Sequence, residues 1–198
     1  MRLSTPRLAA MLVALALGAA GAAETAATDT YAPARPFAEA LVPERAPRRA
    51  PETRLLRRDG GVETGAPWRG RPAVLVFWAT WCPVCRDEMT GVAALARRLA
   101  ARGGAVVAVS VDSGPDAPRR VAEHIAAEGL APIRALVDAE HALAEAVGLT
   151  GVPTAVFLDA RGRIRGRIVG RALWAEPALE AYALGSGPPS ARGDVSPE

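Results

Sequence analysis

The chain has few of the residues that build metal sites or disulfide frameworks. It contains two cysteines and two histidines among 198 residues, and the cysteines, Cys82 and Cys85, stand three positions apart. A disulfide across so short a loop removes little entropy from the unfolded chain, so it stabilises a fold only weakly. Tetrahedral zinc needs four ligands, and His124 and His141 lie far along the sequence. The pair therefore predicts redox exchange, and we expect neither a metal nor any other cofactor.

An excess of charge of one sign is also missing. Lysine is absent, and the 24 basic residues, all of them Arg, nearly balance 21 acidic residues. Binding to nucleic acid relies on a clustered basic surface, which this balance does not predict. We therefore expect no nucleic-acid partner.

The apolar run near the N-terminus is too short to favour a bilayer-spanning helix. Residues 8–23 number sixteen, against the roughly 20 that a spanning helix needs. The run follows Arg2 and Arg7 and ends in small residues, which is the layout of a secretory signal peptide. We expect residues 1–23 to direct export to the periplasm of a Gram-negative bacterium. The protein is then soluble after cleavage, or tethered if the segment stays as an uncleaved anchor.

The rest of the chain divides by composition. Residues 24–51 are rich in Ala, Pro and Arg without a sustained apolar period, which predicts a flexible linker. Residues 52–184 carry the clear periodic signals and form one expected domain. Residues 185–198 are rich in Ser, Pro, Gly and charge, which predicts a disordered tail.

The clearest elements surround the two cysteines. Residues 73–78 form a continuous apolar run, typical of a strand buried on both faces. After the cysteine motif, helical spacing continues to a stop at Gly103 and Gly104. A second buried strand at 105–111 and a helix at 117–128 then indicate a parallel crossover.

Further elements complete an α/β fold, in which helices flank a central mixed β-sheet. An N-terminal β-hairpin extension is expected from residues 53–56 and a strand from Val62 onward, turning at 59–61. The others are a strand at 132–137, a helix at 139–147, a hairpin of 154–158 and 164–169 that turns through 159–162, and a final helix at 174–184.

The position of the cysteines predicts how they react. At a helix N-terminus, unpaired backbone N–H groups and the helix dipole favour a thiolate and lower a cysteine pKa from about 8.5 into the ~3.5–7.5 range. Cys82 is therefore the expected nucleophile. Cys85, one turn further into the helix, would resolve the mixed disulfide.

Two other chemistries remain open. Peroxide reduction would need a different arrangement of Thr and Cys than Thr80-Trp81-Cys82 provides. Thiolates are also soft ligands for Cu(I), so a copper carrier is a second alternative. No methionine-rich or histidine-rich tract accompanies the thiols to assist metal delivery.

Residues 77–89, FWATWCPVCRDEM, resemble the active-site segment of the thioredoxin superfamily. They are most similar to the exported TlpA branch, which includes ResA-like and CcmG-like proteins. The resemblance extends from about residue 71 to 184 and includes residues 106–112, 151–154 and 159–162. It implies a thioredoxin fold and a periplasmic thiol:disulfide oxidoreductase.

The resemblance also implies roles for residues around the dithiol. The pair matching Val152-Pro153 has a cis peptide bond in this family and lies against the cysteines. Because proline has no N–H of its own, the backbone of Val152 is left to pair with an extended partner chain. Val152, Pro153 and Thr154 are the implied substrate-binding loop, and Trp81 is implied to shield Cys82 and to form part of the docking surface.

The sequence departs from the family pattern in ways that bear on its redox chemistry. Pro83 follows the first cysteine, where the branch usually has a proline directly before the second. Pro83 and Val84 are therefore expected to tune the reduction potential. Val76 stands where many thioredoxins have a buried Asp, and Thr90 replaces a proline that kinks the first helix.

Glu88 is the remaining acid near the dithiol, and two roles for it stay open. Resemblance places a Glu at this position close to the active site, where partial burial would raise its pKa and let it accept the proton of Cys85. Alternatively, it is a solvated acid that complements the helix dipole.

The direction of exchange and the partners follow only from the resemblance. It implies a reductase that receives electrons from a membrane thiol carrier and serves apocytochrome c or the assembly proteins of the cytochrome oxidase copper site. An oxidase or isomerase of exported proteins is the alternative. The sequence predicts no oligomeric state.

Overall fold

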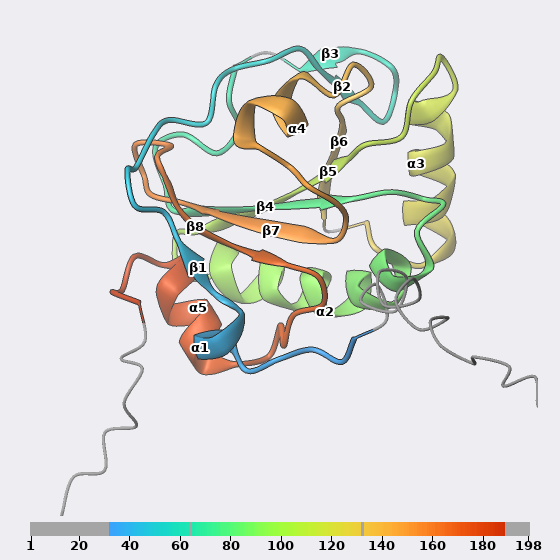
Figure 1. Cartoon of the computed structure of the whole chain (residues 1–198). Helices are drawn as coiled ribbons and strands as arrows, with labels where there is room; N and C mark the ends of the chain where they lie inside the picture. The colour runs from blue at the N-terminus through green and yellow to red at the C-terminus, as the bar shows by residue number, and fades with distance from the viewer. Residues whose placement is uncertain (1–31, 64, 132, 189–198) are drawn as a thin grey trace, which may run out of the picture.

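The computed structural model describes residues 32–188 except 64 and 132, so the predicted signal segment and most of the predicted tail lie outside the described residues. Eight strands form one mixed sheet in the order β1-β8-β7-β4-β5-β6-β2-β3 (Figure 1). Its centre is the parallel set β4 (Ala73–Trp78), β5 (Ala105–Ser110) and β6 (Arg134–Val137). The predicted hairpin of β7 (Thr154–Leu158) and β8 (Ile164–Val169) joins β4 in antiparallel pairing. The expected central mixed sheet is confirmed.

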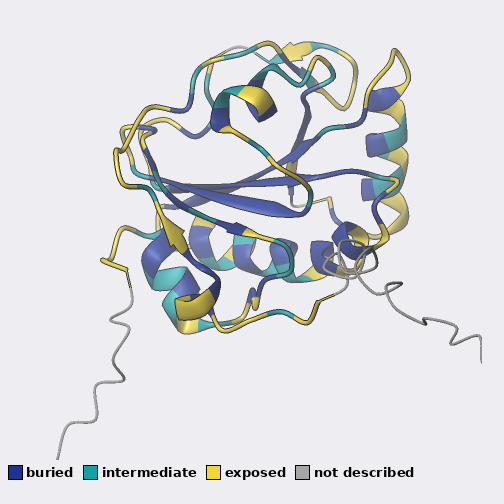
Figure 2. Ribbon diagram, in the orientation of Figure 1, coloured by how far each residue is buried: buried dark blue, intermediate teal, exposed yellow. Residues whose placement is uncertain are grey.

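The core lies on both faces of this sheet. Side chains alternate along a strand, so Val74, Val76 and Trp78 of β4 join one apolar cluster whereas Leu75 and Phe77 join another. The first cluster packs under α2 (Pro83–Ala100), α3 (Ala117–Ala127) and α5 (Pro177–Ala183), and the second under α4 (Ala142–Val147). Figure 2 shows the inner strands buried throughout. Burial on both faces explains the unbroken apolar runs.

Helix α2 begins at the cysteine motif because three local features favour it there. Cys82 is the N-cap, and its sulfur accepts a hydrogen bond from the backbone N–H of Cys85. Pro83 occupies the first turn, where a missing N–H costs nothing. The helix continues without interruption past Thr90 to Ala100. Gly103 then supplies a positive φ of 79° beyond its end.

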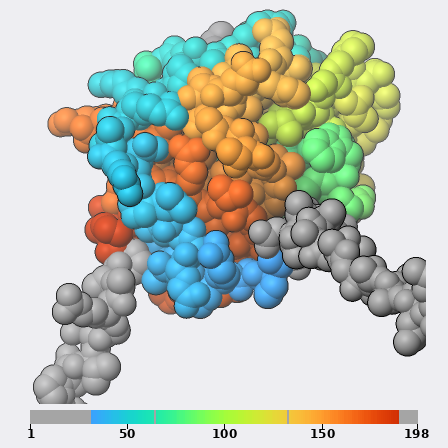
Figure 3. Space-filling view, in the orientation of Figure 1, coloured from blue at the N-terminus to red at the C-terminus, as the bar shows by residue number. Residues whose placement is uncertain are grey.

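The prediction of a flexible linker over residues 24–51 is wrong for the part that the structure describes. Phe37–Ala40 forms helix α1, and Val42–Pro43 forms β1, which pairs with β8. The Phe37 ring is buried. Its centre lies 5.9 Å from the ring centre of Phe157 and 5.5 Å from that of Tyr182. In Figure 3 this blue segment runs over the surface beside the orange and red C-terminal part. The composition misled because a few buried side chains, Phe37 above all with Ala40, Leu41 and Ala50, hold a proline-rich segment that has no sustained apolar period.

The other boundaries shift modestly. The predicted N-terminal hairpin is present as β2 (Leu55–Arg57) and β3 (Val62–Glu63), and β2 pairs with β6 at the sheet edge. Helix α4 starts at residue 142 instead of 139, because His141 adopts a left-handed conformation with φ 59°. Helix α5 starts at Pro177 instead of 174, since a proline is favoured in a first turn.

Candidate active site at the end of strand β4

The two cysteines lie where the central strand meets the longest helix. Strand β4 ends at Trp78, a short turn follows, and Cys82 caps α2. Cys82 and Cys85 form a disulfide. Cys82 is 5% exposed and Cys85 is 1% exposed, whereas the neighbouring Trp81 is 66% exposed. Both cysteines are therefore buried, Cys82 slightly less than Cys85, and Trp81 stands next to Cys82 in the chain at the surface.

A buried carboxylate holds the turn that carries Trp81. Asp112 accepts hydrogen bonds from the Thr80 backbone N–H at 2.9 Å and the Thr80 hydroxyl at 2.6 Å. The Ser110 hydroxyl donates a third at 2.5 Å. Asp112 lies two residues beyond the end of β5, at the same end of the sheet where β4 ends. No role for Asp112 had followed from the sequence; the available signal was an acid placed directly after a buried strand.

The loop 151–153 lies beside this turn. The Val152-Pro153 peptide bond is cis, as the resemblance implied. Thr154 is paired with Phe77 across the β4–β7 ladder, so Pro153 comes next to the end of β4 that leads into the cysteine motif. The Thr154 hydroxyl donates to the Gly151 carbonyl at 2.7 Å, and the Gly170 N–H donates to the Pro153 carbonyl at 2.8 Å. The loop is therefore held in place from two sides.

Glu88 is buried and bonded rather than solvated. The residue is 8% exposed, and its Oε2 accepts hydrogen bonds from the Ala172 N–H at 3.0 Å and the Trp174 indole N–H at 2.9 Å. Its Oε1 lies 3.7 Å from the Arg171 guanidinium. Burial raises the pKa of the Glu88 carboxyl, although the two donors and Arg171 oppose the shift. These contacts rule out the solvated role for Glu88.

The raised pKa predicts a pH-dependent effect of Glu88→Gln on stability. The native state holds the Glu88 proton to a higher pH than the unfolded chain, where the pKa is near the ordinary 4.5. Holding this proton stabilises the native state fully at a pH below the unfolded pKa, and the stabilisation is lost as the pH rises through the native pKa. The wild type should therefore lose stability relative to Glu88→Gln as pH rises above about 4.5. Urea unfolding of both proteins from about pH 4 to about pH 8 measures the difference. Glu128→Gln, at an exposed residue at the end of α3, is the control for loss of an acidic group. A stability difference that stays constant over this range contradicts the prediction.

Both histidines contact residues at or next to the carboxyl ends of the central strands β4 and β5. His124 is on α3, with its ring centre 5.2 Å from that of Trp78. His141 precedes α4, with Nε2 3.0 Å from the Val111 carbonyl oxygen and 3.1 Å from the Ser113 hydroxyl. Across residues 32–188, apart from 64 and 132, no three His, Cys, Asp or Glu side chains are grouped as metal ligands would be.

Comparisons with known proteins agree on one kind of chemistry. The AhpC/TSA family profile matches residues 47–167. The chain is 30% identical over 132 residues to the thiol:disulfide interchange protein DsbE of Pseudomonas aeruginosa, covering 65% of this chain and 69% of that protein. It is 26% identical over 121 residues to the thiol-disulfide oxidoreductase ResA of Geobacillus thermodenitrificans, covering 61% and 67%. Coverage is lower for other DsbE proteins, such as the one from Yersinia pestis, of which the chain spans 58%.

Solved structures agree with the expected fold. A thiol:disulfide interchange protein of the thioredoxin family from Chlorobium tepidum superposes with a TM-score of 0.58 at 26% identity. The superposition covers 71% of this chain and 98% of that one. The thioredoxin fold expected from the sequence is therefore confirmed.

Proposed function

Because this chain belongs to the AhpC/TSA family and is a thioredoxin-fold thiol:disulfide oxidoreductase of the DsbE and ResA type, we propose that it reduces disulfides in partner proteins. The observation that supports this most directly is the Cys82–Cys85 disulfide at the N-terminus of α2, beside a cis-proline loop. The disulfide form is the state that the protein reaches after one round of reduction.

The reaction proceeds in two exchanges. The Cys82 thiolate attacks one sulfur of the partner disulfide, and the other partner sulfur leaves as a thiolate that takes up a proton. Cys85 then loses its proton and attacks Cys82, which releases the second partner thiol and closes the Cys82–Cys85 disulfide. Two electrons pass to the partner. Unpaired N–H groups at the start of α2 favour the Cys82 thiolate.

Glu88 is the group that we assign to accept the Cys85 proton. It lies one turn after Cys85 on α2, and its raised pKa brings its proton affinity closer to that of a thiol. The exchange rate of wild type should then show a titration step that Glu88→Gln lacks; identical pH profiles of the two proteins would remove this role.

The partner chain is proposed to dock between the exposed Trp81 and the loop Val152-Pro153-Thr154. The backbone of Val152 would pair with an extended segment next to the partner's cysteine. Pro83 and Val84 stand between the two cysteines in the sequence and are proposed to set the reduction potential.

Export and the specific partners belong to the same proposal. Residues 1–23 would act as a signal peptide or anchor, which places the dithiol in the periplasm. Electrons would come from a membrane thiol carrier, and the substrates would be apocytochrome c or proteins of copper-site assembly. The similarity to proteins named DsbE supports this assignment. Within the described part of the chain, no helix has the length and apolar character to cross a membrane.

The equilibrium reduction potential of the Cys82–Cys85 couple tests the direction of exchange. Equilibration against a dithiothreitol or glutathione series, followed by Trp fluorescence, should give a value near the roughly −270 mV of thioredoxin. A value near the roughly −120 mV of DsbA would instead assign the protein to disulfide formation. Absence of a reversible two-electron couple would contradict both directions and favour Cu(I) binding.

A further inference from the structure

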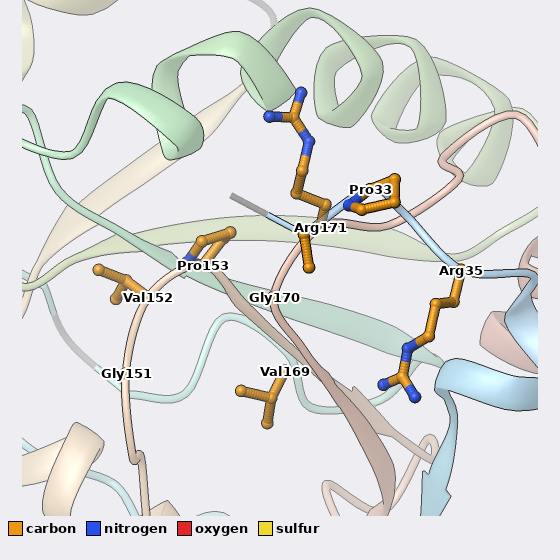
Figure 4. A pocket seen from close by; sticks show the side chains of 9 residues that line it. Pro33, Arg35, Gly151, Val152, Pro153, Val169, Gly170 and Arg171 are labelled. Carbon is orange, nitrogen blue, oxygen red and sulfur yellow. The ribbon is translucent and has the colours of Figure 1, made fainter. Parts of the chain in front are cut away.

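A pocket of about 550 Å³ opens beside the cis-proline loop. One wall is that loop, residues 151–153, and a second is the end of β8 with Gly170 and Arg171. The third wall is the N-terminal segment, through Ala32, Pro33 and Arg35 (Figure 4). Two of its walls are joined to the elements that carry the cysteines. Pro153 precedes Thr154, which pairs with Phe77 near the end of β4, and Arg171 precedes Ala172, whose N–H donates to Glu88 on α2.

The N-terminal segment leaves an opening at the sheet edge here. The segment first bridges to the sheet where Arg35 lies opposite Ala172. Further along the chain, Val42–Pro43 pairs with residues 166 and 167 of β8. Between these two points the chain turns away as α1. Val169 lies in the gap and is exposed. An extended segment of a partner therefore has a sheet edge to lie along.

The charged residues that line the pocket are both positive. Arg35 and Arg171 project in different directions from two sides of the pocket (Figure 4). Arg171 is partly neutralised by Glu88 at 3.7 Å and Asp87 at 3.9 Å. Arg35 is exposed, and no carboxylate of the described residues lies within 4.0 Å of its guanidinium. The Arg35 guanidinium is therefore available to form an ion pair with an acidic group of a ligand.

We propose that this pocket binds an acidic, extended segment of the partner protein next to its reacting cysteine, and that Arg35 determines this specificity. The proposal rests on the disulfide-reductase function given above and names its substrate class. An Asp or Glu side chain a few residues from the partner cysteine would reach Arg35 while the backbone pairs with Val152. Opposite charges at such a rim steer association and discriminate between partners.

Two peptides test this, each with one internal disulfide and identical except that the residues flanking one cysteine are Asp in one and Asn in the other. The reduced full chain should reduce the Asp peptide about fivefold faster than the Asn peptide, as one exposed charge contact allows. Arg35→Glu should abolish or reverse that preference. The matched control, Arg58→Glu, changes an exposed arginine on the β2–β3 turn and should keep it. Raising the salt to about 0.5 M should weaken the preference in wild type.

The outcomes separate this inference from the function on which it rests. Equal rates for the two peptides in wild type, or a preference that survives in Arg35→Glu, would overturn the acidic specificity alone. Failure of wild type to reduce either peptide, together with no exchange with oxidised glutathione, would overturn the reductase function and the inference with it.

Discussion

Replacing Cys82 with Ala should abolish the reduction of disulfides. Replacing Cys85 with Ala should instead stop the reaction one step later, at the covalent adduct between Cys82 and the partner. Both effects follow from where the sulfurs lie. Cys82 caps α2 and is the more exposed of the two, beside Trp81. Cys85 lies inside the first turn and is the less exposed of the two, so we expect a partner disulfide to reach Cys82 first. We expect Cys82→Ala to lower the rate by at least about a thousandfold, as loss of a nucleophile does.

The Cys85→Ala protein is the variant to compare with Cys82→Ala in this experiment. Its Cys82 still attacks, but no second thiol releases the partner, so the mixed disulfide accumulates. Single-turnover reaction with a disulfide peptide, followed by mass spectrometry under non-reducing conditions, measures both quantities. A Cys85→Ala protein that turns over normally, or a Cys82→Ala protein that forms the adduct through Cys85, would reverse the assigned roles.

The dithiol was predictable from the sequence because all its signals are local. A buried strand, Cys-x-x-Cys, and a helix with Pro83 in its first turn stand in one run of residues, so their order alone places the sulfurs at a helix N-terminus. The inner strands were predictable for the same reason, since burial on both faces leaves an unbroken apolar run.

The contacts that support the dithiol were not predictable, because each joins residues distant in sequence. The carboxylate of Asp112 reaches Thr80 across 32 positions, and that of Glu88 reaches Trp174 across 86. Spacing along the chain says nothing about such pairs; they depend on how β5 and the 170–174 loop meet α2 and the turn before it. A family resemblance could place Glu88 near the site without showing its partners.

The N-terminal segment gives the second large effect, because Phe37 is the largest side chain that it buries. Phe37→Ala should destabilise the protein by about 3–5 kcal/mol, the range for removing a buried aromatic ring. Phe37 is 1% exposed and packs against Phe157 and Tyr182. Its backbone N–H also donates to Glu176 at 2.8 Å, but alanine keeps that bond, so the loss comes from the ring.

Urea unfolding of the Phe37→Ala protein measures this directly, with Val42→Ala as the control. Val42 lies five residues further along the same segment, in β1, yet it is 57% exposed, so its truncation should change stability by no more than about 0.5 kcal/mol. If residues 32–51 were a linker, both variants would match wild type. A large loss for Phe37→Ala alone would show that the segment belongs to the folded domain. That conclusion also bears on specificity, since the same segment carries Arg35 to the pocket beside the cis-proline loop.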